Sequence, residues 1–390
     1  MKTSAVICEY NPFHAGHTYH LRRTRETADA VIAVMSGSFT ERGTPAVISK
    51  YERARVAVLN GADLVLELPF PFCSGGAEVF ARGGIGLTER LGVVDALSFG
   101  SESGDASLLS RTAERLNSED FRTALQASAK ENRTLASGNL FFDTVRRLYG
   151  EDAADFGSND ILGLAYMREL AARKSRITPE PIRRIGNGYN ETDGEGFLSA
   201  SGVRESLQTG VIPAELPEES RKALREAMEN GTISSFDALF LPYVSYFRTH
   251  RSDAWGDCPE GNAEIFDRLC SSAVGATDLT SFFEEAKTKT YSFSRLYRAA
   301  LFAFLQVGRK DVGEVSYTRV LAANATGRRL LHEISRCSDL PIITKSADYL
   351  GLGIDEAYEL GLRADALWLM TLGKPAPADA LIKTAPVMAE

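Results

Sequence analysis

Three of the chain's five histidines lie within seven residues, at His14, His17 and His20. His14 and His17 flank Gly16 in a short His-Ala-Gly-His turn. Imidazoles three residues apart at a helix start can face the same way and donate hydrogen bonds to phosphate oxygens. Such donors stabilise the charge that develops on a transferred phosphoryl group. Gly16 has no Cβ, so a phosphate can approach the backbone closely, and the turn therefore predicts a phosphate-binding site.

The elements around this turn must hold it in place. An apolar run over 5–8 leads into the turn and a helix-like run over 17–27 leads out of it. This is how α/β proteins present backbone N–H groups to a phosphate. Further apolar runs alternate with helical patterns and predict an α/β fold with a Rossmann-like, doubly wound parallel sheet. We expect these strands at 30–35, 63–68, 96–99 and 181–185.

Several other side chains can add to the phosphate site. Lys50, in the first turn of a predicted helix, either contacts phosphate or is a solvated residue. Arg42, in the polar loop after the second strand, either gates the site or binds RNA. Ser201 and Arg204 open a short helix and form a second candidate anion site, although an ordinary helix cap with a surface arginine fits them too. We expect Glu9 to cap the turn structurally.

The length of 390 residues predicts two domains, which we place at 1–210 and 211–390. The first is the α/β domain, whereas helical patterns without strand alternation dominate the second. No apolar run is long enough to span a bilayer, and we expect no signal peptide. The five cysteines are far apart, which argues against a disulfide framework or a zinc site and favours the cytoplasm.

A basic segment stands out in this acidic chain. Residues 287–333 carry nine cations and three anions, whereas the whole chain has a net charge of −8. Basic residues track phosphates, and interleaved aromatics can stack on unpaired bases. The alternative is a solvated helix face with aromatics in the core. Within the segment we select as RNA-binding candidates Lys287, Lys289, Arg295 and Arg298, and as stacking candidates Tyr291, Phe293, Tyr297 and Tyr317.

Five stretches of the first half, taken together, resemble one family. They are Glu-Tyr-Asn-Pro-Phe-His at 9–14, Met-Ser-Gly-Ser-Phe-Thr-Glu-Arg-Gly at 35–43, Glu-Leu-Pro-Phe at 67–70, Phe-Gly-Ser-Glu at 99–102 and Arg-Ile-Gly at 184–186. These stretches resemble the bacterial tRNA-Met cytidine acetate ligases of the HIGH nucleotidyltransferase superfamily. The second half resembles the same family at 287–298 and 340–345, so the likeness covers nearly the whole chain.

The resemblance implies a reaction and a site. ATP and acetate would form acetyl-adenylate, and the wobble cytidine of elongator tRNA-Met would then attack it to give N4-acetylcytidine. His14, His17 and Lys50 would serve catalysis, and Mg²⁺ would bind through the nucleotide without a dedicated metal site. Asp160 stands where the family has an amide. The implied ATP contacts are Ile7, Cys8, Glu9, Tyr10, Asn11, Pro12, Phe13, His14, Ala15, Gly16, His17, Thr18, Tyr19, His20, Gly100, Asn159, one of Arg183 and Arg184, Ser201 and Arg204.

Two other functions fit parts of this sequence. An enzyme of the same superfamily could act on a small phosphorylated substrate, but it would need little beyond the sheet domain. A non-catalytic RNA-binding protein could keep the nucleotide fold, but it would not need the intact His14-Gly16-His17 turn. Neither membrane association nor an obligate protein partner is expected from the sequence.

Overall fold

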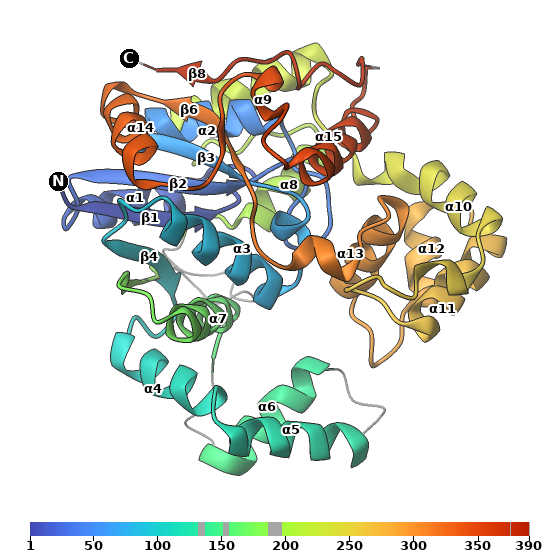
Figure 1. Ribbon diagram of the computed structural model, residues 1–390. Coiled ribbons are helices and arrows are strands. Elements are labelled where there is room, and N and C mark those ends of the chain that lie inside the picture. The colour runs from blue at the N-terminus through green and yellow to red at the C-terminus, as the bar shows by residue number, and fades with distance from the viewer. Residues whose placement is uncertain (132–136, 151–155, 186–196, 375, 390) are drawn as a thin grey trace.

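An eight-stranded sheet forms the centre of the computed structural model, which describes residues 1–131, 137–150, 156–185, 197–374 and 376–389 (Figure 1). Five of its strands are parallel and adjacent, in the order β5-β4-β1-β2-β3. They are β1 (Thr3–Cys8), β2 (Ala30–Ser36), β3 (Leu64–Leu68), β4 (Ala96–Ser101) and β5 (Thr178–Arg183). The predicted α/β fold with a doubly wound parallel sheet is confirmed.

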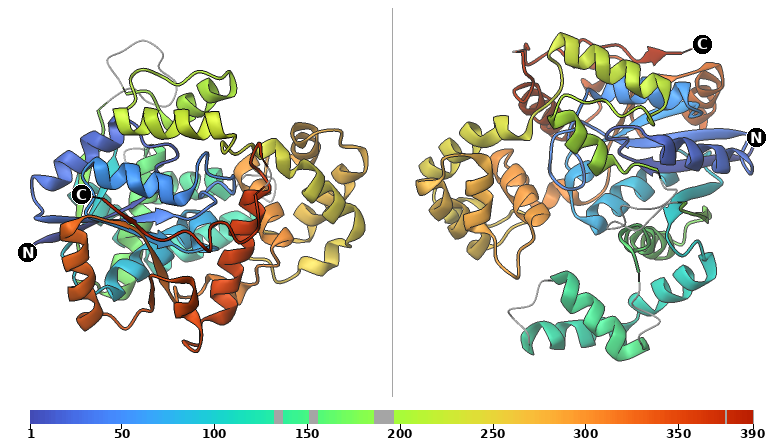
Figure 2. Two further views of the ribbon diagram at one scale, coloured as in Figure 1. Left: turned by 90° about the horizontal axis from the view of Figure 1, so that it is seen from above. Right: turned by 180° about the vertical axis from the view of Figure 1, so that it is seen from behind.

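Helices cover both faces of this sheet, as short continuous apolar strands require. On one face lie α1 (Ala15–Arg25) and α2 (Lys50–Leu59), and on the other lie α3 (Ala77–Arg90), α7 (Ser158–Arg173) and α14 (Ala325–Cys337) (Figure 2). Right-handed crossovers between parallel strands produce this division. The carboxyl ends of β1, β2 and β4 therefore open onto one edge, where the helices begin.

The second half returns to the sheet, which its helical patterns did not predict. Strand β6 (Thr318–Ala323) is antiparallel to β3, and β7 (Ile342–Ile343) and β8 (Val387–Met388) pair with β6. The β6 sequence, Thr-Arg-Val-Leu-Ala-Ala, is short and alanine-rich. Periodicity cannot distinguish such a run from a buried helical segment. The second half is mainly helical, as predicted, but it also contributes these short strands to the sheet, and the domain boundary at 210 stays a prediction.

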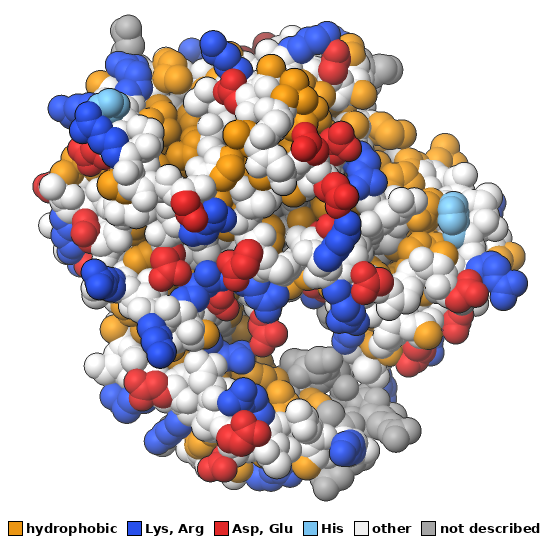
Figure 3. Space-filling view, viewed as in Figure 1, with side chains coloured by type: hydrophobic (Ala, Val, Ile, Leu, Met, Phe, Trp, Pro, Cys, Tyr) orange, Lys and Arg blue, Asp and Glu red, His pale blue; other side chains and the backbone are white. Residues whose placement is uncertain are grey.

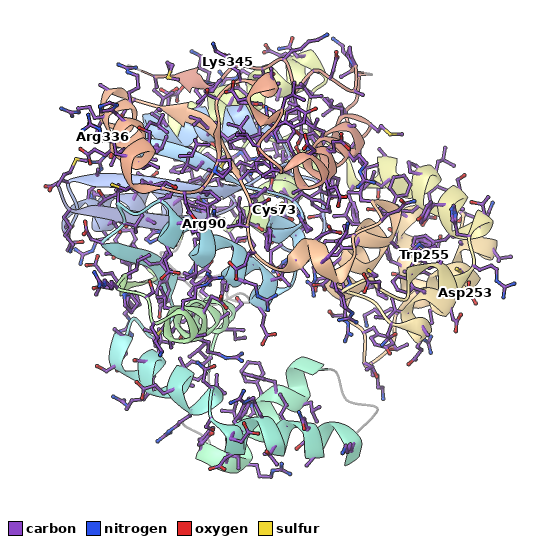
Figure 4. All side chains as sticks on the ribbon, in the orientation of Figure 1. Cys73, Arg90, Asp253, Trp255, Arg336 and Lys345 are labelled. Carbon is purple, nitrogen blue, oxygen red and sulfur yellow. The ribbon has the colours of Figure 1, made fainter. Side chains whose placement is uncertain are left out.

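Two groups of helices project from this body (Figure 1). An arm is formed by α4 (Ala106–Leu116), α5 (Glu119–Glu131) and α6 (Ser137–Tyr149). A lobe is formed by α10 (Phe240–Thr249), α11 (Ala263–Gly275), α12 (Leu279–Ala286) and α13 (Phe293–Phe304). Trp255 lies inside the lobe, with its ring centroid 5.1 Å from those of Phe247 and Phe266 (Figure 4). The lobe therefore has an aromatic core of its own.

The remaining helices pack on the body. They are α8 (Ala200–Gln208), α9 (Glu218–Asn230) and α15 (Asp355–Leu369). Ser220 of α9 donates a hydrogen bond to the carbonyl of Phe13, so this helix braces the turn after β1. A search of the described helices finds none that combines the length and the apolar character needed to cross a membrane.

Candidate active site

A cavity of about 510 Å³ lies at the carboxyl edge of the sheet, where β1, β4 and β5 end. Most of the expected ATP contacts line it: Ile7, Cys8, Glu9, Tyr10, Asn11, His14, Gly16, His17, Tyr19, His20, Gly100, Asn159, Arg183 and Arg184. Pro12, Phe13, Ala15, Thr18, Ser201 and Arg204 are not among the lining residues. The structure thus brings together residues from 7–20, 100, 159 and 183–184, which are far apart in the sequence.

The two histidines of the turn hold each other at the N-terminus of α1. The Nδ1 of His14 accepts a hydrogen bond from the Gly16 N–H, and the Nδ1 of His17 accepts one from the His14 N–H, both at 3.1 Å. Their rings stack with centroids 3.7 Å apart. A Cβ at Gly16 would lie 2.9 Å from the His14 ring, so Gly16 makes room for this ring as well as for a ligand.

These hydrogen bonds assign the tautomer of both rings. Because each Nδ1 is an acceptor, the hydrogen of the neutral ring is on Nε2, which is left to donate. Burial, together with the positive charges of Arg184 and Arg204, lowers the pKa of His14 to about 4. Burial also lowers the pKa of His17 well below its ordinary value, with the neighbouring His14 and His20 acting in the same direction. Near neutral pH both rings are therefore uncharged donors.

The third histidine, His20, lies deeper and supports the sheet. Its Nε2 lies 2.9 Å from Ser98 Oγ of β4, and that hydroxyl lies 2.8 Å from Thr24 Oγ1. Burial lowers the pKa of His20 to about 4, with a further contribution from Arg184. In the unfolded chain this pKa is about 6.5. His20 thus adds to the stability of the fold when it is neutral.

We expect the protein to lose stability on acidification from about pH 6.5 to pH 4, because the unfolded state binds more protons in that window. A folded-state pKa of about 4 for His20 means that acidification lowers the free energy of unfolding by at most about 3 kcal/mol through this residue. His20→Gln keeps a donor near Ser98 without a titrating group, so its urea midpoint should fall less between pH 7 and pH 5. Equal falls for the variant and the wild type would contradict this role for His20.

Asp160 organises the loop after β4. Its carboxylate accepts hydrogen bonds from the N–H groups of Glu102 and Ser103, at 3.1 and 3.0 Å, and from the Ser101 hydroxyl. Glu102 in turn accepts from the Asp160 N–H at 2.8 Å and from Asn159 Nδ2 at 2.7 Å. A carboxylate suits this position because all of its partners are donors.

Of Arg183 and Arg184, Arg184 is the better candidate for the ATP contact. Its guanidinium donates to Asn159 Oδ1 at 3.3 Å, and its charge lowers the pKa values of all three histidines. Its aliphatic stem lies 3.6 Å from where a Cβ of Gly100 would be, so Gly100 leaves space for it. Arg183 also lines the cavity but packs against Gly104.

The Ser201–Arg204 pair braces the turn from outside the cavity. Arg204 donates to the Asn11 carbonyl at 2.8 Å and to Ser201 Oγ at 2.9 Å. Ser199 is the N-cap of α8, accepting from the Gly202 N–H, and it is Ser199 that lines the cavity. Arg204 acts on the site through its charge, which lowers the pKa of His14.

Lys50 does not reach the cavity, and its assignment to phosphate is corrected. Its ammonium is buried and donates to Glu67 Oε1 at 2.7 Å and to Asp365 at 2.7 and 2.9 Å. Arg319 lies in the same cluster, 3.6 Å from Asp365. Burial alone would lower the pKa of Lys50, but the carboxylates of Asp365 and Glu67 raise it. Lys50 is thus a buried, charged and fully paired structural residue.

The loop after β2 brings Glu41 and Arg42 to the cavity. The Glu9 carboxylate accepts from the Glu41 N–H at 2.6 Å, so Glu9 braces this loop and has a structural role. Burial raises the pKa of Glu9, and the positive charges of Arg204, Arg53 and Arg42 oppose the rise. Sequence reasoning missed several other lining residues, among them Ala77, Phe80, Leu162, Tyr166 and Phe197. They are apolar or aromatic residues, and no polar motif marks them.

The basic segment does not form one surface. Arg298 is bound to Glu260 at 2.7 Å and to Glu41 at 3.5 Å, so it ties the lobe to the loop after β2. Arg319 is buried, and Lys310 pairs with Glu356. Arg328 and Arg329 are exposed on α14, where basic side chains gather on the side away from the lobe (Figure 3).

The interleaved aromatics belong to cores. Tyr291 and Tyr317 are buried, and the Tyr297 ring packs edge-on against Phe283, with centroids 4.6 Å apart. Phe293 stacks on Tyr297 and lies under Lys287. The idea that these rings stack on RNA bases is corrected, because their faces are already occupied. Lys287 and Lys289 are exposed, and the guanidinium of Arg295 lies over the Tyr291 ring at 5.4 Å.

A doubly wound sheet with a His-x-Gly-His turn at the start of its first helix defines a nucleotidyl transferase of the HIGH type. The family model described as HIGH Nucleotidyl Transferase matches residues 1–380. A curated tRNA(Met) cytidine acetate ligase from Caldicellulosiruptor saccharolyticus is 35% identical over 90% of this chain and 88% of its own length. One from Anoxybacillus flavithermus is 32% identical over 98% of both chains. The chain belongs to the tRNA(Met) cytidine acetate ligase family.

Solved structures agree with this assignment over the whole chain. The crystal structure of Thermotoga maritima TmcAL bound with alpha-thio ATP superposes with a TM-score of 0.91 at 29% identity, covering 100% of this chain and 99% of the other. The apo form of the same protein gives a TM-score of 0.92. The resemblance seen in the sequence motifs is confirmed.

Proposed function

We propose that this protein joins acetate to the N4 amine of the wobble cytidine of elongator tRNA-Met, by way of acetyl-adenylate. The observation that carries this is the stacked His14–His17 pair in a cavity that also holds Arg184. Neutral Nε2–H donors and a fixed cation suit a triphosphate. The names of the relatives, tRNA(Met) cytidine acetate ligase, and the alpha-thio ATP bound to the solved neighbour support these substrates.

In the first step an acetate oxygen attacks the α-phosphorus of ATP. The bond from that phosphorus to the bridging oxygen breaks, and pyrophosphate leaves with its electron pair. Acetate is already an anion near neutral pH, so no general base is needed. The protein has to position the reactants and stabilise charge on the phosphates. His14, His17 and Arg184 fit this role, as does the N-terminal dipole of α1.

In the second step the cytidine amine attacks the acetyl carbon, AMP leaves, and the amine gives up one proton to solvent. Mg²⁺ would come with the phosphates. Within the described ranges no group of three or more His, Cys, Asp or Glu side chains is placed to hold a metal ion.

Incubation with ATP, labelled acetate and total bacterial tRNA, followed by digestion, tests the proposal directly. Labelled acetylcytidine is expected. Adenylate formation without labelled RNA would favour the small-substrate enzyme, and no turnover at all would favour a non-catalytic RNA-binding protein. Analysis of the labelled tRNA species then tests the choice of elongator tRNA-Met.

We further propose that the lobe contacts tRNA through Lys287 and Lys289, as part of the second domain over 211–390. Both side chains are exposed on the lobe, which Arg298 ties to the cavity loop. Arg295 can add to this surface.

Lys287→Glu with Lys289→Glu should weaken tRNA binding and reduce the salt slope by about 2, because each phosphate contact contributes about 1. Pyrophosphate exchange should be unchanged. The control is Arg328→Glu with Arg329→Glu on α14, which makes the same change in charge on the side away from the lobe. This control variant should bind tRNA more tightly than the lobe variant does. Equal losses in both double variants would count against the lobe surface.

A further inference from the structure

The residues assigned to ATP occupy only part of the cavity. Gly100, Asn159 and Arg184 come from the β4 and β5 side, and the histidine turn follows the central strand β1. Other lining residues come from the loop after β2, from α3 and from the middle of α7. These lining residues are not among those assigned to ATP.

Two aromatic side chains form the inner wall of that part. Phe80 of α3 and Tyr166 of α7 both line the cavity, and each is only 1% exposed. The Tyr166 ring packs edge-on against Phe99, with centroids 5.8 Å apart, which fixes its orientation. Cys8 and Glu9 at the end of β1 and Glu41 in the loop after β2 line the same cavity as Tyr166.

The Tyr166 hydroxyl is buried and has no hydrogen-bond partner among the described residues. A buried hydroxyl without a partner is costly, because it has lost its hydrogen bonds to water. Burial raises the pKa of Tyr166 well above its ordinary value, so the group keeps its proton and can donate. A donor held at a cavity wall without a protein acceptor is suited to a ligand acceptor.

Building on the proposed ligase function, we propose that Tyr166 and Phe80 form the acetate pocket. The Tyr166 hydroxyl donates a hydrogen bond to the acetate carboxylate, and the Phe80 ring limits the length of the acid. Acetate must lie next to the α-phosphate, and Tyr166 and Phe80 line the same cavity as the histidine turn. Arg42 also lines this cavity, as do Glu9 and Glu41.

Tyr166→Phe tests the donor. It keeps the ring and removes only a hydroxyl that has no hydrogen-bond partner among the described residues, so the melting temperature should be unchanged or higher. Hydrogen bonds to charged groups contribute about 1.5–3 kcal/mol, so the KM for acetate in pyrophosphate exchange should rise about 10-fold or more. The KM for ATP should stay within about twofold.

Tyr243→Phe is the matched control. Tyr243 lies in α10 of the lobe, and its hydroxyl is likewise buried without a partner among the described residues. Its removal should leave the KM for acetate unchanged. An unchanged KM for acetate in Tyr166→Phe, or an equal rise in both variants, would overturn the role of the Tyr166 hydroxyl.

Phe80→Leu and Phe80→Ala test the size limit. Pyrophosphate exchange is measured with acetate, propionate and butyrate. The ratio of kcat/KM for the longer acid to kcat/KM for acetate (the acid ratio) should rise by about fourfold for each added methylene. Phe80→Leu keeps an apolar side chain, so it carries the test if the alanine variant does not fold. Phe197→Ala changes an aromatic on the nucleotide side and should leave the acid ratio as it is.

An unchanged acid ratio in Phe80→Leu would overturn the role of Phe80. If the proposed function is wrong, the result is different, because the wild-type protein would then show no acetate-dependent exchange at all. That result would overturn the acetate pocket as well. Exchange in the wild type without an effect of Tyr166→Phe or Phe80→Leu would leave the ligase function standing and overturn only the pocket.

Discussion

Replacing His14 by alanine is expected to lower the rate of acetate-dependent pyrophosphate exchange by about 10²–10³, as for other preorganised donors to a transition state. The His14 ring is buried, neutral and held by the Gly16 N–H, so its Nε2–H is fixed before ATP arrives. Water cannot replace it without reorganising. The loss should fall on kcat more than on the KM for ATP, because the donor acts where charge develops.

Two further variants separate this role from helix capping, since His14 is also the N-cap of α1. His14→Asn keeps a side-chain acceptor for the Gly16 N–H but has no donor at the position of Nε2, so it should be stable and slow. His14→Gln extends an amide N–H toward that position and should recover part of the rate. A fast His14→Asn variant would show that capping is the only function of His14.

The histidine turn could be located from the sequence because its geometry is local. The capping interactions of His14 and His17 span only two or three residues, and the apolar run before them identifies the strand. The same holds for β2, β3 and β4, which are continuous apolar runs flanked by polar loops. Local patterns of this kind determine where helices and strands begin.

The sequence-based predictions that the structure corrects failed because they depend on contacts between distant parts of the chain. Lys50 looked like a phosphate ligand because its partner Asp365 lies 315 residues away. The cations of 287–333 looked like one surface, but the chain enters the sheet as β6 between the lobe and α14. A one-dimensional charge pattern does not show which cations are paired. The sequence did not indicate the proposed acetate pocket for a related reason, since Phe80 and Tyr166 are indistinguishable from core residues until the cavity is known.

The buried cluster around Lys50 connects the two halves of the chain. Lys50 and Glu67 come from the first half, and Arg319 and Asp365 come from the second. All four side chains are at most 7% exposed. Asp365 also accepts from Ser38 Oγ at 2.6 Å, and Ser38 is at the start of the loop that carries Glu41 and Arg42.

Asp365→Ala should therefore destabilise the fold by about 3–5 kcal/mol, because it leaves two buried cations facing the single carboxylate of Glu67. Urea unfolding measures this. Asp379→Ala removes a carboxylate from the exposed pair with Lys383 and should leave the urea midpoint unchanged.

The double variant Lys50→Met, Asp365→Leu should recover much of the free energy of unfolding that Asp365→Ala loses. It removes one charge of each sign and keeps the site filled with apolar side chains. Such recovery would show that the cost in Asp365→Ala comes from uncompensated charge rather than from lost packing. A double variant as unstable as the sum of its single variants would contradict the pairing of Lys50 with Asp365. Because Ser38 loses its acceptor in both Asp365 variants, a slow but stable double variant would place Asp365 among the residues that position the cavity loop.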